Sequence, residues 1–275
     1  MIVVESGGTK STWVYRDASG QLTQKATVGL HPQELTDQKK TIFLQFIQEN
    51  NFQQEEVYFF GAGCESKEAK TKIIQFLNLF QLNVRLVETD IYAACIAHLG
   101  NREGVVGIIG TGAVVAYFDG KNVKQITSGW GYILGDEGSG FDLGKRLIQY
   151  YLRGELSLTV RKKIEEYFQG HSIIHRVYEP DGRKFVAGLT KIIHEFLHES
   201  EVSELISQGF SDFCQTALKP LKTSIQEIHF IGNVAYYFEN QLSNALTHHG
   251  YRLGSIKCEA AQAVYEFFEI NGIHR

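Results

Sequence analysis

The stretch VVESGGTKSTWVY, residues 3–15, joins two short β-rich runs through a turn of glycine and hydroxyl residues. Branched and aromatic side chains favour strands, and paired glycines favour a tight turn between them. The backbone N–H groups of Gly7 and Gly8 can face a ligand with no Cβ atom in the way. Thr9 and Lys10 add a hydroxyl and a cation, so the set suits phosphate oxygens. An ordinary glycine hairpin is the simpler interpretation of this segment taken alone.

A second glycine turn has the same chemistry. Gly110, Thr111 and Gly112 separate two apolar runs in the stretch IIGTGAVV. Each turn opens a strand-turn-strand-turn-strand pattern, which suggests duplicated halves. Two such turns on two halves can hold one polyphosphate from both sides. Gly232 adds a glycine at a strand-to-helix junction, where a nucleoside can pass close to the backbone or where a helix simply starts.

The pattern along the chain predicts an α/β protein of two lobes, residues 1–103 and 104–275, joined near residue 103. The second lobe repeats the three-strand meander and then carries a helical insertion from Ser139 to about Lys222. The helices expected outside this insertion are residues 36–50, 66–80, 91–100, 235–249 and 260–270, with Thr36 and Ser66 as N-caps of the first two.

Carboxylates stand where strands or glycine loops end. Asp136 and Glu137 lie in GWGYILGDEGSGFDLGKRL, whose six glycines exceed what helix capping requires. These acids could accept hydrogen bonds from sugar hydroxyls or hold a water on Mg²⁺, and helix capping is the alternative. Asp90 follows an apolar strand at the start of a helix. It is either an N-cap or a base that takes a proton from a hydroxyl nucleophile.

Composition limits the class of protein. The chain has 275 residues, 43% of them hydrophobic and 21% charged, with a net charge of −4, so nothing indicates a nucleic-acid partner. Its four cysteines show no CxxC spacing, which favours reduced thiols over a zinc or redox motif. No signal peptide and no membrane-spanning stretch are evident, so the expected location is the cytoplasm.

Taken together, these segments resemble the sugar-kinase, actin and heat-shock protein superfamily. More narrowly, they resemble the BadF/BadG/BcrA/BcrD ATPase family and, within it, the N-acetylglucosamine kinase-like proteins. The matching stretches are SGGTKSTW, GLHP, VYFFGAGC, TDIYAA, GIIGTGAVVAYFDG, GWGYILGDEGSGFDLGKRL, FIGNVAYYF and GYRLG, in family order from residue 2 to about 255. The resemblance implies two ribonuclease-H-like lobes, as in the actin-like ATPase and sugar-kinase fold, with a ligand cleft between them.

The resemblance also implies roles for single residues, with ATP and Mg²⁺ as cofactors. Gly7, Gly8, Thr9 and Lys10 would form the first phosphate loop, and Gly110, Thr111 and Gly112 the second. Gly232 and Asn233 would contact the adenosine. The sugar would contact His31, Asp90, Gly112 and Asp136, with Asp90 as the base that activates its hydroxyl, and Glu5 would stand at the metal. The implied reaction is ATP-dependent phosphorylation of an amino sugar, with N-acetylglucosamine as the first candidate, and the family also allows a homodimer.

Four positions, in three places, depart from the family pattern. Glu5 replaces the usual Asp beside the metal, and His31 replaces the Asn that often follows GL. Ala113 and Val114 replace the Ser and Asn that help to form the amino-sugar site. The loss of each hydrogen bond to a buried partner costs about 1–3 kcal/mol, so the sugar site is more altered than the nucleotide site.

These departures leave alternatives open. A sensor that binds sugar or nucleotide without turnover is one, and Glu5, Ala113 and Val114 favour it. An activase ATPase for a radical dehydratase is another. That class needs clustered cysteines for an iron–sulfur cluster, and the four cysteines here lie far apart in sequence.

Overall fold

The computed structural model describes residues 1–8 and 10–272. Thr9 lies outside the described residues. The chain forms two compact units. Unit 1 contains Met1–Arg102 together with the segment that starts at Glu259, and unit 2 contains Glu103–Cys258.

Unit 1 is built on a five-stranded mixed sheet with the order β3-β2-β1-β4-β5. The first three strands are antiparallel neighbours, and β4 and β5 extend the sheet in parallel with β1. The strands are β1 (Ile2–Ser6), β2 (Lys10–Arg16), β3 (Leu22–Val28), β4 (Glu56–Gly61) and β5 (Asn83–Thr89). The helices are α1 (Asp37–Asn50), α2 (Lys67–Asn78), α3 (Asp90–Leu99) and α12 (Ala261–Asn271).

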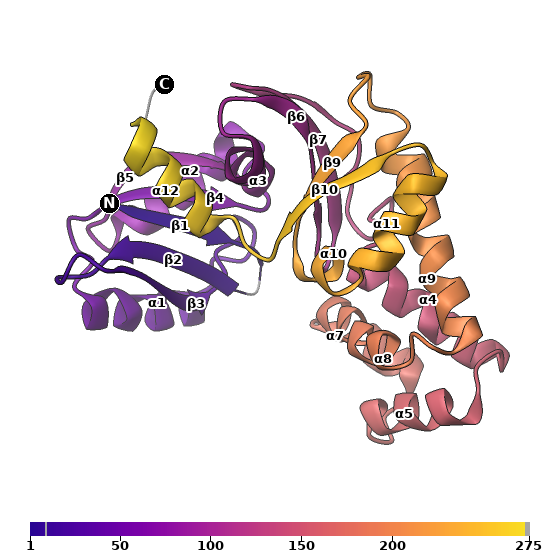
Figure 1. The fold of residues 1–275 in the computed structure, drawn as a ribbon. Helices are drawn as coiled ribbons and strands as arrows, with labels where there is room; N and C mark the ends of the chain where they lie inside the picture. The colour runs from indigo at the N-terminus through magenta and orange to yellow at the C-terminus, as the bar shows by residue number, and fades with distance from the viewer. Residues whose placement is uncertain (9, 273–275) are drawn as a thin grey trace. The chain divides into compact units, whose positions relative to one another are not determined.

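Alternation along β4 shows which helices cover each face of this sheet. Phe59 belongs to an apolar core with Phe43 of α1 and Phe76 of α2. Its neighbour Phe60 points to the other face, where its ring contacts Tyr92 of α3 and Phe268 of α12. The sheet is therefore covered by α1 and α2 on one face and by α3 and α12 on the other. Figure 1 shows α12 in yellow beside the indigo β1.

The position of α12 changes the expected domain division. The expected boundary near residue 103 agrees with the structure at that point, but the C-terminal segment was expected in the second lobe. It returns to unit 1, where α12 packs on α3, β1 and β2. The physical reason is apolar burial, since Phe268 inserts beside Tyr58 and Phe60.

Unit 2 repeats the sheet of unit 1 strand for strand, with the order β10-β9-β6-β7-β8. Here too an antiparallel three-strand meander is extended by two parallel strands. The strands are β6 (Glu103–Ile109), β7 (Ala113–Asp119), β8 (Val123–Ile126), β9 (Glu227–Ile231) and β10 (Arg252–Lys257). The shared order confirms the duplicated α/β fold of two ribonuclease-H-like halves.

The helices of unit 2 mostly lie between β8 and β9, as expected. They are α4 (Gly140–Arg153), α5 (Leu158–Phe168), α6 (Ile173–Val177), α7 (Gly182–Gly188), α8 (Thr190–Glu195), α9 (Ser200–Phe213) and the π-helical turn η1 (Cys214–Leu218). The single helix expected at 235–249 is in fact two, α10 (Asn233–Tyr237) and α11 (Glu239–His248). The chain turns at Phe238, whose buried ring faces Phe210 of α9.

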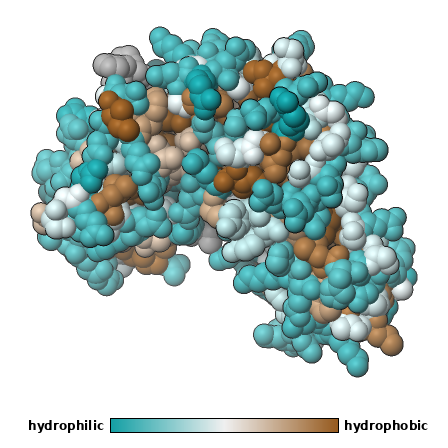
Figure 2. Space-filling model, in the orientation of Figure 1, coloured by the Kyte–Doolittle hydropathy of each residue, from teal (hydrophilic) through white to brown (hydrophobic). Residues whose placement is uncertain are grey.

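The buried cores are apolar, and the surface is mostly hydrophilic. Each unit has its own buried apolar cluster, and the cluster of unit 2 joins its sheet to α4 and α9. On the face drawn in Figure 2, both units show mostly hydrophilic residues with scattered hydrophobic ones. Among the exposed apolar side chains, Trp130, Ile133 and Leu134 lie in the glycine-rich loop that precedes α4.

Candidate functional site

The carboxyl ends of β1, β4 and β5 gather the candidate residues of unit 1. These three strands are adjacent and parallel, so the residues that follow them lie at one edge of the sheet. Glu5 lies near the end of β1, and Asp90 follows β5 directly. Burial is the main cause that raises the pKa of Glu5, and the negative charges of Glu259 and Asp90 raise it to a smaller extent. Ligands of open α/β sheets commonly bind at this edge.

The first glycine turn is a hairpin between β1 and β2. The Gly7 N–H donates to the Lys10 carbonyl oxygen at 3.0 Å. The Lys10 ammonium, expected at a phosphate, forms an ion pair with Glu259 at 2.7 Å. Glu259 comes just before α12, so this cation already has a carboxylate partner at the C-terminal segment of unit 1.

Glu5 caps α12 from the other end of the chain. One oxygen, Oε2, accepts the N–H of Ala260 at 2.6 Å and the N–H of Ala261 at 3.0 Å. These are donors that the first turn of a helix leaves without partners. Burial raises the pKa of Glu5 to about 7, although the two backbone donors act in the opposite direction. To bind a metal ion, Glu5 would therefore have to use its other carboxylate oxygen or give up its hydrogen bonds to the start of α12.

Asp90 is the first residue of α3 and does not cap it. Thr89 is the N-cap, since its hydroxyl accepts the N–H of Tyr92. Asp90 Oδ1 instead accepts the N–H of Ile91 at 2.8 Å. Burial, with a smaller contribution from the charge of Glu65, raises the pKa of Asp90 to about 6, although the Ile91 N–H acts in the opposite direction. Asp90 is half-buried, and a carboxyl whose pKa lies near neutral pH has the property that a general base needs.

His31 lies beside the end of β4. A Cβ atom added to Gly63, whose φ is +78°, would meet His31 Nε2 at 2.4 Å, so the imidazole covers this glycine. The His31 Nδ1 atom accepts the N–H of Gln33 at 3.3 Å. The ring thus lies at the same sheet edge as Glu5 and Asp90.

In unit 2, the second glycine turn and Gly232 meet at the ends of β6 and β9. Gly232 has φ +119°, and a Cβ atom there would meet the Ile109 carbonyl oxygen at 2.4 Å. Only glycine fits this close approach. The carbonyl oxygens of Gly110 and Thr111 accept the first N–H groups of α4 at 2.8 and 3.2 Å. The turn is therefore held between a neighbouring strand end and a helix start, while a Cβ atom at Gly110 would meet nothing within 4 Å.

Asp136 approaches the same turn from the glycine-rich loop. Its side chain is 3% exposed, and its φ of +64° is uncommon for a residue other than glycine. The carboxylate accepts the N–H of Ala113 and lies 3.2 Å from the Arg183 Nη2 atom. Burial raises the pKa of Asp136, while the Ala113 N–H and the Arg183 charge lower it. A Cβ atom on Gly112 would lie 2.8 Å from Asp136 Oδ2, so acid and turn are in contact.

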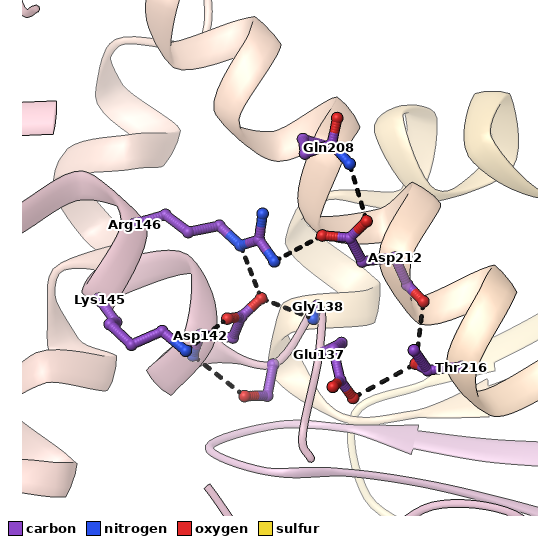
Figure 3. Close-up of polar contacts among 9 residues, drawn as sticks. Glu137, Gly138, Asp142, Lys145, Arg146, Gln208, Asp212 and Thr216 are labelled. Atoms are coloured by element: carbon purple, nitrogen blue, oxygen red, sulfur yellow. Dashed lines mark hydrogen bonds and ion pairs between the residues drawn. The ribbon is translucent and has the colours of Figure 1, made fainter. Parts of the chain in front are cut away.

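A network of acidic and basic side chains lies beside this loop (Figure 3). Arg146 donates to Asp142 at 2.8 Å and to Asp212 at 2.7 Å, and Lys145 is paired with Asp142 at 3.1 Å. Glu137 accepts the Thr216 hydroxyl at 3.3 Å. These residues line a pocket of about 340 Å³ together with Tyr132, Ile133, Leu134, Gly135 and Gln215. The ion pairs of Arg146 with Asp142 and Asp212 tie α4 to α9, and the contact of Glu137 with Thr216 holds the loop that carries Asp136.

The sequence pattern missed two residues of these sites. Arg183 lies 47 positions from Asp136 in a short helix with no motif, and Glu259 lies 249 positions from Lys10. Neither has a local signal, because each acts through a tertiary contact. Asn233, expected at the adenosine, is the exposed first residue of α10.

Three further findings concern membrane helices, the cysteines and groups of metal-ligating side chains. None of the described helices has the length and apolar character needed to cross a membrane. Cys64, Cys95 and Cys214 are buried, and burial raises the pKa of each thiol to about 12. Within residues 1–8 and 10–272, no three His, Cys, Asp or Glu side chains are grouped so that they could hold a metal ion.

Comparison with known proteins points to sugar kinases. The chain is 29% identical over 143 residues to an N-acetylmuramic acid/N-acetylglucosamine kinase of Clostridium acetobutylicum, which is 48% of this chain and 46% of the relative. It is 39% identical over 92 residues to the glucosamine kinase GspK of Vibrio cholerae, which is 33% of this chain and 30% of the relative. The chain thus spans less than half the length of the curated relatives it matches.

A solved structure covers the whole chain. The crystal structure of a proposed N-acetylglucosamine kinase from Porphyromonas gingivalis aligns over 99% of this chain and 100% of that one, with 28% identity and a TM-score of 0.89. No model of a known protein family matches the sequence. The comparisons therefore support a sugar-kinase relationship and the two-unit α/β fold, and the narrower family that the motifs resemble is not shown.

Proposed function

We propose that the protein is a kinase that transfers the γ-phosphoryl group of ATP to a hydroxyl of an amino sugar, with N-acetylglucosamine as the first candidate. The observation that carries this proposal is the geometry at the second glycine turn. Gly232 and the buried Asp136 both contact this turn in unit 2. The whole-length similarity to a proposed N-acetylglucosamine kinase supports the choice of sugar.

The second glycine turn fits a nucleotide. Gly110 has open space where a side chain would stand, so phosphate oxygens can approach its backbone. Gly232 and Asn233, at the next strand end, are assigned to the adenosine. Asp136 accepts sugar hydroxyls beside Gly112. In unit 1, Gly7, Gly8, Thr9 and Lys10 are assigned to phosphate binding, and Lys10 would leave Glu259 for the phosphates.

Asp90 supplies the base. Its carboxylate takes the proton of the attacking hydroxyl while the sugar oxygen forms a bond to the γ-phosphorus. The bond between that phosphorus and the bridging oxygen breaks, and ADP leaves with the electron pair. Because such transfers depend mainly on alignment and on neutralising charge, a base of pKa about 6 is sufficient. His31, beside Gly63 at the same edge, is assigned to the sugar.

The metal fits less well than the nucleotide. Mg²⁺ usually keeps several waters and binds through one or two carboxylates and the substrate phosphates. Glu5, the residue expected to hold it, uses Oε2 to cap α12 and has a pKa of about 7. We therefore assign no step to the metal.

A sensor that binds without turnover is the second candidate. Ala113 and Val114 favour it, since neither side chain can replace the hydrogen bonds of Ser and Asn. Val114 packs toward Gly129, at the start of the glycine-rich loop. This candidate keeps ligand binding and loses the chemical step.

A coupled assay of ADP release separates the two candidates. Purified protein with Mg-ATP is given N-acetylglucosamine, N-acetylmuramic acid, glucosamine and glucose in turn, with the Asp90→Asn variant as the control. A kinase consumes ATP only with its sugar, and Asp90→Asn removes that consumption. Calorimetric binding of a sugar with no ADP release would establish the sensor instead.

A further inference from the structure

We propose that Arg183 is a catalytic residue whose guanidinium contacts the phosphoryl group during its transfer. The inference rests on the proposed kinase function, which assigns the phosphates to the Gly110–Gly112 turn and the acceptor sugar to Asp136. Arg183 is the cation that reaches both. It comes from α7, a helix of the insertion that packs against α4.

The geometry at Gly112 carries the proposal. A Cβ atom on Gly112 would lie 2.8 Å from Asp136 Oδ2 and 2.9 Å from Arg183 Nη2. Carboxylate and guanidinium thus cover the same backbone position, at the boundary between the assigned phosphate turn and the assigned sugar ligand. Arg183 also lies over the Tyr132 ring, at 5.3 Å from its centroid, which limits where the guanidinium can point.

The chemistry of arginine fits this place. A guanidinium has five N–H donors, and the Nη2 contact with Asp136 at 3.2 Å engages one of its two terminal nitrogens. The side chain is 45% exposed, so its other donors can reach a ligand. During transfer, they would donate to the non-bridging oxygens while one O–P bond breaks and the other forms. Arginines in this role stabilise the charge that develops on the group being transferred.

A purely structural ion pair explains the arrangement less well. Because the Arg183 side chain is 45% exposed, solvent screens its pairing with Asp136 and reduces what the pair contributes to stability. Asp136 is nearly fully buried and has a left-handed backbone, a combination that is typical of functional sites. The other acids near Asp136 are Glu137 and Asp142, and both have partners elsewhere. The contact with Asp136 places the positive charge of Arg183 beside the assigned acceptor site, next to the turn that continues into the apolar Ala113 and Val114.

The test uses Arg183→Met and Arg183→Ala, with Arg161→Met as the matched control. Arg161 lies in the same unit, in α5, and also covers a tyrosine ring, that of Tyr151 at 5.1 Å, which is not part of the glycine turn. With the best sugar of the wild-type chain, Arg183→Met should lower kcat by on the order of 10²-fold with a smaller change in the KM for sugar. Guanidinium ion, below concentrations that unfold the chain, should restore part of the activity of Arg183→Ala.

A second measurement does not depend on turnover. ADP with aluminium fluoride mimics the phosphoryl group in transfer, and its binding in the presence of sugar should be lost in Arg183→Ala while ADP alone still binds. An unchanged kcat with a raised KM for sugar would overturn the proposal and make Arg183 a sugar ligand. Equal losses in Arg161→Met and Arg183→Met would also overturn it. If no sugar stimulates ATP consumption by the wild-type chain, the kinase function and this inference are overturned together. If the wild type is active and the Arg183 variants are equally active, only the inference is overturned.

Discussion

The Glu5 carboxylate accepts the backbone N–H of Ala260 at 2.6 Å, across 255 positions of sequence. Through this contact, the residue that precedes the first glycine turn holds the start of the C-terminal helix. Lys10, at the other side of the turn, forms an ion pair with Glu259, which also lies just before this helix. Residues on both sides of the first glycine turn thus contact residues 259–261 at the start of α12, within unit 1.

Removal of the Glu5 carboxylate should loosen α12. Glu5→Ala leaves the N–H groups of Ala260 and Ala261 without their acceptor, which should lower the free energy of unfolding by about 1–3 kcal/mol. Glu5→Gln keeps an acceptor oxygen and should cost less. Urea unfolding followed by tryptophan fluorescence measures the difference. Equal stability of Glu5→Ala and the wild type would show that the cap contributes nothing.

Glu5 should also make stability depend on pH. Burial raises its pKa from 4.5 to about 7, so the folded chain holds a proton that the unfolded chain releases. The stabilisation from this group is fully present below pH 4.5 and is lost as the pH rises through about 7. Glu5→Gln cannot titrate, so the difference in free energy of unfolding between Glu5→Gln and the wild type should change across this window. A difference that stays constant from pH 4.5 to 8 would contradict the raised pKa.

Asp90→Asn should abolish sugar-dependent ATP consumption, with a loss of about 10²–10⁴-fold in kcat and little change in nucleotide affinity. In the wild type, kcat/KM should rise with pH through about 6, because only the ionised Asp90 can take a proton. Initial rates over pH 5–8 measure both effects. A variant with wild-type turnover would make Asp90 a structural residue of α3.

Two alanine substitutions in the second glycine turn should differ in kind. A Cβ atom at Gly110 meets nothing within 4 Å, so Gly110→Ala should fold normally but obstruct phosphate and raise the KM for ATP by roughly tenfold. Gly112→Ala places its Cβ atom 2.8 Å from Asp136 Oδ2, so it should displace Asp136 and Arg183 and lower stability by about 1–3 kcal/mol. Thermal melts and ATP titrations compare them. Normal ATP affinity in Gly110→Ala would argue against a phosphate at this turn.

Restored polarity beside Asp136 should strengthen binding of an amino sugar. Ala113→Ser with Val114→Asn should raise kcat/KM for N-acetylglucosamine, by up to roughly tenfold for each hydrogen bond regained. Kinetics with N-acetylglucosamine and with the best wild-type substrate check this. Loss of activity on the latter would show that the apolar pair is an adaptation to another sugar.

The features that could be predicted from the sequence are those that depend on residue type and local spacing. The glycine turns, the strands that flank them and the N-caps Thr36 and Ser66 follow from residue type and spacing, and the structure confirms them. The repeated meander likewise predicted two sheets of the same order.

The features that the sequence did not predict depend on contacts between distant segments. The return of α12 to unit 1 follows from Phe268 and Glu5, which have no common motif. The approach of Arg183 to Asp136 depends on how α7 packs against α4. Asp90 and Thr89 both fit an N-cap by residue type, and only the structure shows that Thr89 takes that place.

Phosphorus NMR of a reaction mixture tests the kinase function most directly. Purified chain is incubated with Mg-ATP and N-acetylglucosamine, and the spectrum is followed over time. The proposed function predicts a new phosphomonoester resonance, coupled to the protons of a sugar carbon, that grows in step with ADP and is absent with Asp90→Asn. Release of inorganic phosphate in place of a sugar phosphate, or an unchanged ATP spectrum with every amino sugar in the panel, would contradict it.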